Sequence, residues 1–222
     1  MMWFKGILRL ILCLSFLIPG FPSEARSETV HILFSNDTHG TYKPTAIKFE
    51  DKIRQVGGFE AVSHYVYQIR SLHDNVLLID TGDVMTGTMG VEMEYQGAVG
   101  GALIDFMNLV GYDAWCYGNH DFDRGQLNTL KLSRMANFPK IMANIVYETS
   151  GRIFPANPFH IFQVGEIKVG VIAVMEQNFL VEVLRESVQG LSVLSSIPLL
   201  NAYIPLLDSQ TDLIIAVVHS HF

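Results

Sequence analysis

The chain has 222 residues and a formal net charge of −7, with 15 Lys and Arg against 22 Asp and Glu. That length allows one domain with a sizeable hydrophobic core. A protein that binds a nucleic-acid polymer needs a basic patch, and the acidic balance of this chain argues against that class of partner.

The first 25 residues have the organisation of a secretory signal peptide. Lys5 and Arg9 precede an apolar stretch over residues 10–18. The small residues that usually precede a cleavage site follow this stretch, up to Ala25. This stretch is short against the roughly 20 residues that a membrane span needs. We therefore expect a signal peptide over 1–25, a folded domain over 26–222, a secreted or periplasmic location and no stable membrane span after cleavage. A retained membrane anchor is the alternative.

The first part of the domain has the pattern of a strand, a helix and a second strand. Residues 30–35 and 76–80 form apolar runs, and between them apolar residues recur with a period near 3.6 over 61–72. Such a unit makes the two strands parallel, so their carboxyl ends meet at one edge of a sheet. Residues 41–55 are mixed and charged, and we expect an irregular surface excursion there.

The rest of the chain continues the alternation of strands and helices. Residues 84–101 are rich in Gly and Met, which indicates either a flexible loop beside a substrate or a surface loop that fills a gap. Cys116 is the only thiol outside the signal peptide, and we expect it to be buried. The remaining pattern predicts strands over 114–117, 140–144, 159–164, 168–174 and 213–218, and helices over 102–109, 126–136 and 199–207.

Four of the predicted strands end in side chains that bind metals or transfer protons. Oxygen and imidazole ligands without thiolates suit Mn²⁺, Fe or Zn²⁺, and a carboxylate can bridge two ions. The pattern therefore indicates a dinuclear metal centre, although the third segment alone is also explained as a polar turn that caps the next helix. The four segments are Asn36-Asp37-Thr38-His39-Gly40, Gly82-Asp83, Gly118-Asn119-His120-Asp121-Phe122-Asp123 and His219-Ser220-His221.

In their order and spacing, these segments resemble the motifs of the calcineurin-like metallophosphoesterases, and within them the secreted 5′-nucleotidase branch. The resemblance implies an α/β fold, a sandwich of two mixed β-sheets flanked by helices. It also implies a domain that is incomplete at its C-terminal side, because the family continues with a further strand and a Gly-His-x-His or Gly-His-x-Gln segment that supplies one more ligand to each metal.

The resemblance also implies the metal ligands. Asp37 and His39 hold one divalent ion, Asp83 bridges, and Asn119 and His219 hold the second ion. A water between two such ions loses a proton easily and becomes a nucleophile at neutral pH. Whether the ions are Mn, Zn or Fe stays open.

His120 and Asp123 resemble the catalytic His-Asp pair of the family. His120 is placed to donate to a phosphate oxygen or to the leaving group, and it binds substrate together with Asn119. Asp123 orients the imidazole, and it is also explained as a residue at the start of a helix, near the positive end of the dipole. Of the two late histidines, only His219 matches the family position, although His221 is a further candidate for the metal site.

The function implied by the resemblance is metal-dependent hydrolysis of a small phosphate ester, foremost a nucleotide. Hydrolysis of a 2′,3′-cyclic nucleotide, or of a sulfur ester as in the thiosulfohydrolases, is the alternative chemistry, because fold and metal residues are shared among these enzymes. Two hypotheses in which the chain is not an enzyme are also open. The chain is then an inactive truncated product, or a binding module that holds a ligand or a partner that completes the sheet.

Overall fold

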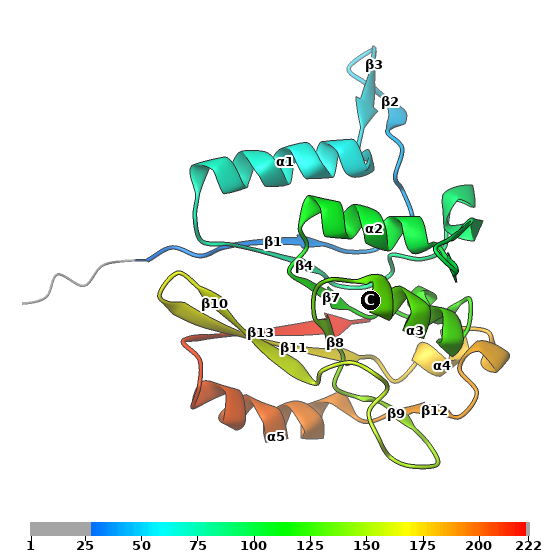
Figure 1. Ribbon diagram of the computed structural model, residues 1–222, viewed down its shortest axis with the longest axis vertical. Coiled ribbons are helices and arrows are strands. Elements are labelled where there is room, and N and C mark those ends of the chain that lie inside the picture. Colours follow the sequence, from blue (N-terminus) through cyan, green and yellow to red (C-terminus); the bar gives the residue numbers. More distant parts are fainter. Residues whose placement is uncertain (1–27, 221–222) are drawn as a thin grey trace, which may run out of the picture.

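The computed structural model describes residues 28–220, and Figure 1 shows that they fold in layers. Helices α1 (Gly58–Leu72) and α2 (Gly101–Val110) lie on one side of a four-stranded sheet. A three-stranded sheet lies on its other side, and α5 (Ser196–Asp208) covers the outer face of that second sheet. The predicted α/β class, with two sheets and helices outside, is confirmed. The predicted signal peptide over 1–25 and the candidate His221 lie outside the described residues.

The four-stranded sheet has the order β1-β4-β7-β8, and its pairings are all parallel. Since parallel strands point the same way, the loops that follow them leave from one edge of the sheet. The edge strand β1 exposes 72% of Phe34, whereas β4 is buried over most of its length. The strands are β1 (His31–Ser35), β4 (Val76–Asp80), β7 (Ala114–Cys116) and β8 (Lys140–Ile141).

The second sheet combines β10 (Phe159–Val164), β11 (Ile167–Met175) and β13 (Leu213–His219). The hairpin of β10 and β11 is antiparallel, as predicted, and β13 pairs with β11 in parallel. The strand β13 lies at an edge of this sheet and exposes Val218. Its carboxyl end carries His219 toward the loops of the first sheet, so the two sheets together build the candidate site.

The strand β11 joins the main hydrophobic core to the cluster beneath α5, because it packs on both of its faces. Successive side chains on a strand point to opposite faces. Val171 and Ala173 therefore join the main hydrophobic core, whereas Ile172 and Val174 pack with Leu207 of α5 in a smaller cluster. A strand buried on both faces has the continuous apolar run seen in this sequence.

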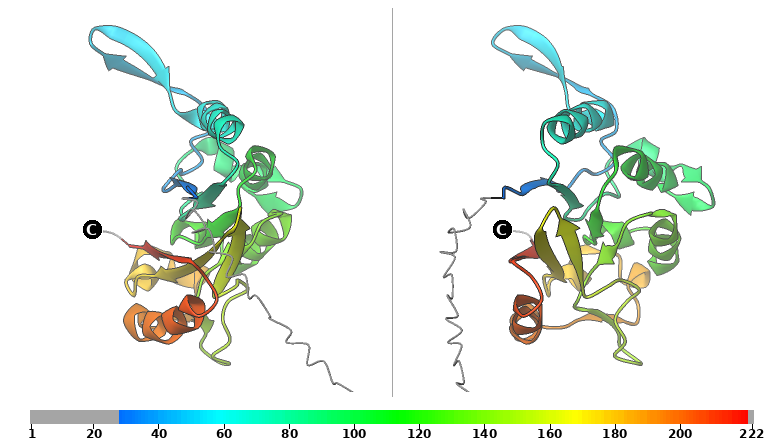
Figure 2. Two further views of the ribbon diagram at one scale, coloured as in Figure 1. Left: turned by 90° about the vertical axis from the view of Figure 1, so that its left-hand side faces the viewer. Right: turned by 60° about the vertical axis from the view of Figure 1, so that its left-hand side comes forward.

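Residues 41–55 differ from the expected irregular excursion. They contain most of an antiparallel hairpin formed by β2 (Thr45–Phe49) and β3 (Lys52–Val56), which Figure 2 shows projecting from the body of the molecule. Every residue of both strands is exposed. The turn uses Glu50 and Asp51 in the left-handed region instead of the usual Asn-Gly or Gly-Gly pair. The sequence therefore lacked the ordinary hairpin signal.

The helix predicted over 126–136 is α3 (Gln126–Met135), and Cys116 is buried as expected. In the Gly- and Met-rich segment, Met85 is buried while Met89 is exposed, so the segment both fills the core and faces solvent. Across residues 28–220, none of the helices has the length and apolar character needed to cross a bilayer. The short elements are η1 (Met89–Glu92), β5 (Glu94–Tyr95), β6 (Ala98–Val99), η2 (His120–Phe122), β9 (Ile145–Tyr147), α4 (Phe179–Glu182), η3 (Arg185–Ser187) and β12 (Leu191–Val193).

Candidate metal centre

The loops that follow β1 and β4 are joined through their backbones. The N–H of Asp37 donates to the carbonyl of Gly82 at 3.1 Å, and the N–H of His39 donates to the carbonyl of Asp83 at 3.0 Å. The hydrogen bonding between the two strands thus continues beyond their ends. As a result, side chains far apart in the sequence lie next to one another.

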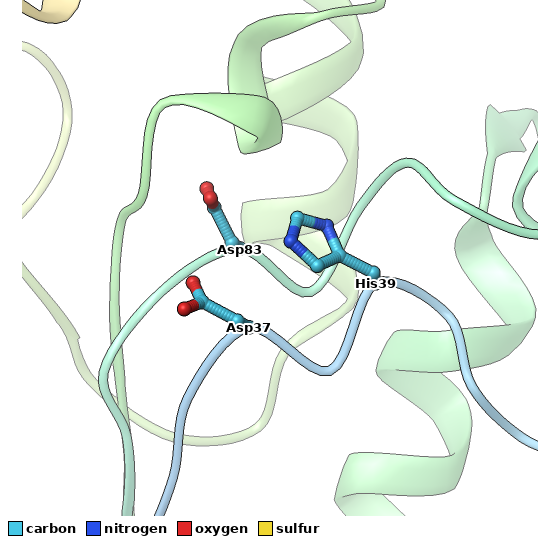
Figure 3. A group of neighbouring side chains, drawn as sticks. All are labelled: Asp37, His39 and Asp83. Atoms are coloured by element: carbon cyan, nitrogen blue, oxygen red, sulfur yellow. The ribbon is translucent and has the colours of Figure 1, made fainter. Parts of the chain in front are cut away.

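Asp37, His39 and Asp83 form a group that can hold a metal ion, as Figure 3 shows, with ligand atoms that all lie within 4.8 Å of one another. Their φ angles of 50°, 45° and 59° fall in the left-handed region, which non-glycine residues seldom adopt and which is enriched at functional sites. The Nδ1 of His39 lies 3.2 Å from the carbonyl oxygen of Met85 and donates to it. In the neutral ring, Nε2 is then left with its lone pair for a metal.

A second group of acceptor atoms includes the same carboxylate of Asp83. His219 Nδ1 donates to the Thr81 carbonyl at 3.0 Å, and Nε2 lies 3.0 Å from Asn119 Oδ1 and 3.4 Å from Asp83 Oδ2. Asn119 and Asp83 are each 1% exposed, and His219 is 6% exposed. If the imidazole is neutral, His219 Nε2, Asn119 Oδ1 and Asp83 Oδ2 are three hydrogen-bond acceptors that face one another without a donor.

Such a buried arrangement requires either a proton on His219 Nε2 or a cation among the three atoms. Burial lowers the pKa of His219, but the hydrogen bond and the charge of Asp83 more than offset this effect and raise the pKa to about 9. In the metal-free chain, the proton on His219 Nε2 therefore occupies the position that a cation would take. The donor set of carboxylate, amide and imidazole fits a divalent ion such as Mn²⁺, Fe²⁺ or Zn²⁺.

Two glycines allow these loops to approach each other closely. A Cβ atom on Gly118 would lie 2.2 Å from Asp83 Oδ1. A Cβ atom on Gly82, whose φ is 115°, would lie 2.6 Å from His219 Nδ1. Any other residue at either position would displace a candidate ligand, so the Gly-Asp and Gly-Asn spacing of the sequence has a steric cause.

Asp121 connects the loops, a role that the sequence reasoning did not assign to it. It is 1% exposed, and an ionised carboxylate can accept many N–H groups without presenting a donor of its own. Burial and the nearby Asp83 carboxylate raise its pKa to about 7, while backbone N–H groups lower it. Asp121 therefore positions both metal loops. Its five hydrogen bonds come from the backbone N–H groups of Asp83, Val84, Met85 and Gly118 and from the indole of Trp115.

The predicted contact between His120 and Asp123 is present, with 2.8 Å between Nδ1 and Oδ2. Thr86, which sequence reasoning missed because a lone hydroxyl in a Gly- and Met-rich loop gives no pattern, donates to the same oxygen at 2.5 Å. The hydrogen bond that His120 donates to Asp123 raises the pKa of His120, although burial lowers it. Burial raises the pKa of Asp123, but the hydrogen bonds from His120 and Thr86 more than offset it, and the net shift is downward.

The imidazole of His120 lies at the border of the candidate centre. Its ring centroid is 5.2 Å from that of His39, and its backbone N–H donates to Asp83 Oδ1 at 2.8 Å. Because Nδ1 faces Asp123, Nε2 is the nitrogen left to exchange a proton with a substrate. The structure therefore brings all seven predicted site residues into one region: Asp37, His39, Asp83, Asn119, His120, Asp123 and His219.

Comparisons with known proteins show which family the chain is similar to. Residues 30–221 match the family model described as calcineurin-like phosphoesterase. The 5′-nucleotidase of Rattus norvegicus is 36% identical over 172 residues, which make up 73% of this chain and 29% of the rat protein. The NAD 5′-nucleotidase of Haemophilus influenzae is 27% identical over 162 residues, or 71% of this chain and 26% of that protein.

A solved structure shows the same similarity. The crystal structure of a putative 5′-nucleotidase from Staphylococcus aureus, in complex with alpha-ketoglutarate, matches with a TM-score of 0.73 and 28% sequence identity. The match covers 86% of this chain and 37% of that one. The chain thus spans well under half of the length of each of these three relatives.

Proposed function

The chain belongs to the calcineurin-like phosphoesterase family, and we propose that it hydrolyses a small phosphate ester, foremost a nucleotide, with the help of two divalent metal ions. The observation that carries this proposal is that two groups of acceptor atoms both include the carboxylate of Asp83. Relatives named 5′-nucleotidase and NAD 5′-nucleotidase support the choice of a nucleotide.

In this proposal, Asp37 and His39 would hold one ion, Asn119 and His219 would hold the other, and Asp83 would serve both. When bound, two such ions polarise phosphoryl oxygens and lower the pKa of water to near neutrality. Backbone carbonyls fix Nδ1 of both histidines as the donor, so that Nε2 of each ring would be the nitrogen available to an ion.

His120 and Asn119 act on the substrate. Once a water has released one proton to solvent, its oxygen would form a bond to phosphorus as the bond to the leaving oxygen breaks. His120 Nε2 would give its proton to that leaving oxygen and regain one from solvent. Asp123 and Thr86 hold the imidazole and favour its protonated form. The Nδ2 of Asn119 is buried and has no hydrogen-bond partner within residues 28–220, which supports donation from this atom to a phosphoryl oxygen.

We further propose that the protein acts outside the cytoplasm. The basic residues, short apolar stretch and small residues over 1–25 support secretion or export to a periplasm. The described residues offer no helix that could span a membrane after cleavage. Detection of the mature N-terminus in culture medium or periplasmic extract tests this location.

The metal content of the purified chain after incubation with Mn²⁺ or Zn²⁺ tests the function first, with Asp83→Asn as the control. We expect two ions per wild-type chain and close to none in the variant. Release of phosphate from adenosine 5′-monophosphate is then measured beside hydrolysis of 2′,3′-cyclic adenosine monophosphate and of a thiosulfate ester. A chain that binds two ions and cleaves none of the three contradicts the proposal.

A further inference from the structure

The buried amide of Asn144 joins the two sheets. Asn144 lies beyond the end of β8 in the first sheet, and its side chain is fully buried. Its Oδ1 accepts the backbone N–H of Met175 at 2.7 Å, and its Nδ2 donates to the carbonyl of the same residue at 2.7 Å. A side chain at the end of the first sheet thus pairs with the last residue of β11 in the second sheet.

Further hydrogen bonds of Asn144 and its neighbour strengthen this junction. Nδ2 of Asn144 also donates to the carbonyl of Leu194 at 2.9 Å, and the N–H of Leu194 donates to the carbonyl of Asn144 at 2.9 Å. The N–H of Ala143 donates to the carbonyl of Ala173 at 2.7 Å, so the chain that leaves β8 lies beside β11 (Figure 1). Both polar atoms of the amide therefore have partners, as a buried amide requires.

Met175 is also the residue that lies opposite His219. The strands β11 and β13 pair in parallel, with Met175 in register with His219, and the N–H of Glu176 donates to the carbonyl of His219 at 3.0 Å. The strand β13 lies at an edge of its sheet and pairs with β11. The place of His219 relative to the first sheet therefore depends on the last residues of β11, which Asn144 holds.

The candidate ligands Asn119 and His219 come from different sheets. Asn119 follows β7 of the first sheet, and His219 ends β13 of the second, with 3.0 Å between Asn119 Oδ1 and His219 Nε2. A metal site tolerates displacements of only about 0.5 Å. Apolar contacts between the sheets are not directional, whereas hydrogen bonds have a defined length and angle. The amide of Asn144 supplies such bonds at the end of β11 that lies beside His219.

We propose that Asn144 is a positioning residue for the metal centre. Its amide fixes the carboxyl end of β11 against the first sheet and thereby sets the place of His219 beside Asn119. Asn144 acts through the backbone of Met175 and not by contact with an ion. This inference rests on the proposed function, because that function requires the site to which His219 belongs.

Asn128 offers a matched control with the same chemistry at another place. Its side chain is also buried, its Oδ1 accepts the N–H of Val99 at 2.9 Å, and its Nδ2 donates to the carbonyl of the same residue at 2.9 Å. Val99 lies opposite Glu94 in the pairing of β5 and β6, not opposite a candidate ligand. A substitution at Asn128 therefore breaks the same kind of buried contact without releasing the end of β11.

The imidazole ¹⁵N chemical shifts of the metal-free chain test the inference first, because they report the hydrogen bonds of each ring nitrogen. Asn144→Leu keeps the branched shape of the side chain but removes its polar atoms. We expect the His219 signals to move in this variant and the His39 signals to keep their wild-type positions. In Asn128→Leu, the signals of both histidines should keep those positions. Unmoved His219 signals in Asn144→Leu, or equal movement in the two variants, overturn the inference.

A titration with Zn²⁺, followed through the same signals, tests the metal centre. In Asn144→Leu, half-saturation at His219 should need about tenfold more Zn²⁺ than in the wild type, an effect typical of residues that hold a metal ligand in place. His39 should respond as in the wild type, and Asn128→Leu should match the wild type at both histidines. An equal loss at His39 and His219 in Asn144→Leu contradicts a role in placing His219.

The two experiments separate this inference from the proposed function. If the wild type binds no Zn²⁺ at either histidine, the proposed function fails, and the shifts of the metal-free chain alone decide whether Asn144 positions His219. If Asn144→Leu does not fold, Asn144→Ser and Asn128→Ser take the place of the leucine variants. The shorter side chain breaks the pairing with Met175 but leaves room for water to bond the freed backbone groups.

Discussion

The two halves of the candidate metal centre share Asp83 but are built in different ways. Asn119 and His219 are buried, and both are held by contacts between the two sheets. Asp37 is exposed and His39 is partly exposed, on a loop that is held mainly by backbone hydrogen bonds to its neighbour. The comparison shows that the buried half needs a cation or a proton to be stable, whereas the exposed half remains open to solvent and substrate.

The largest effect is expected from Asp83→Asn, because this residue serves both halves. The amide removes the negative charge between the ions and introduces a donor where both ions need an acceptor. We expect the metal content to fall from two ions per chain to close to none, and hydrolysis to fall by about a thousandfold or more. Metal analysis and phosphate release measure this, and retention of one ion in the variant would mean that the halves are independent.

The His120→Ala variant should hydrolyse its substrate more slowly but bind metal as the wild type does. His120 borders both halves, but its side chain belongs to neither group of candidate ligands. Loss of a proton donor should lower kcat by about 10² to 10⁴-fold while two ions stay bound. His160→Ala, a change in β10 outside the site, serves as the control. Loss of either ion in His120→Ala contradicts this division of roles.

Asp121→Asn should show how far the centre depends on one buried carboxylate. The amide replaces an acceptor oxygen by a donor and leaves buried N–H groups of the loops without partners. We expect a loss of about 2 to 4 kcal/mol in the free energy of unfolding, measured with urea on the metal-free chain. Asp208→Asn, an exposed change at the end of α5, should leave the stability unchanged. An equal loss in the free energy of unfolding in both variants would show that Asp121 has no special role in holding the loops.

The buried half should also make the stability of the metal-free chain depend on pH. The pKa of His219 is about 9 in the folded chain, above its ordinary value of 6.5. Its stabilisation is therefore fully present below about pH 6.5 and lost as the pH rises through about 9, a change of about 3 kcal/mol.

Urea unfolding of the chelator-treated chain at pH 6 and pH 9.5 measures that change. His219→Gln should show a flatter dependence, whereas Asp37→Asn, in the exposed half, should keep the full dependence of the wild type. The same slope in His219→Gln and in the wild type would assign the pH dependence to another group.

Much of the fold could be predicted because its signals are local. The period of apolar residues identified α1, and the continuous apolar runs identified β4, β11 and β13. The β2-β3 hairpin was missed because its turn has no glycine. Short strands such as β9 and β12 were also missed, since a few residues carry too little periodicity to separate them from a loop.

The sequence by itself determined which side chains make up the candidate centre. The segments that carry them follow or end apolar runs, and the parallel strands β1, β4 and β7 deliver three of these segments to one edge of the first sheet. Only the tertiary structure decided how these side chains are held. The carbonyls of Thr81 and Met85 fix the histidine tautomers, and Asp121 joins the loops of β4 and β7. These contacts join backbone and side-chain groups that are distant in the chain, and such partners leave no mark on the pattern of residues.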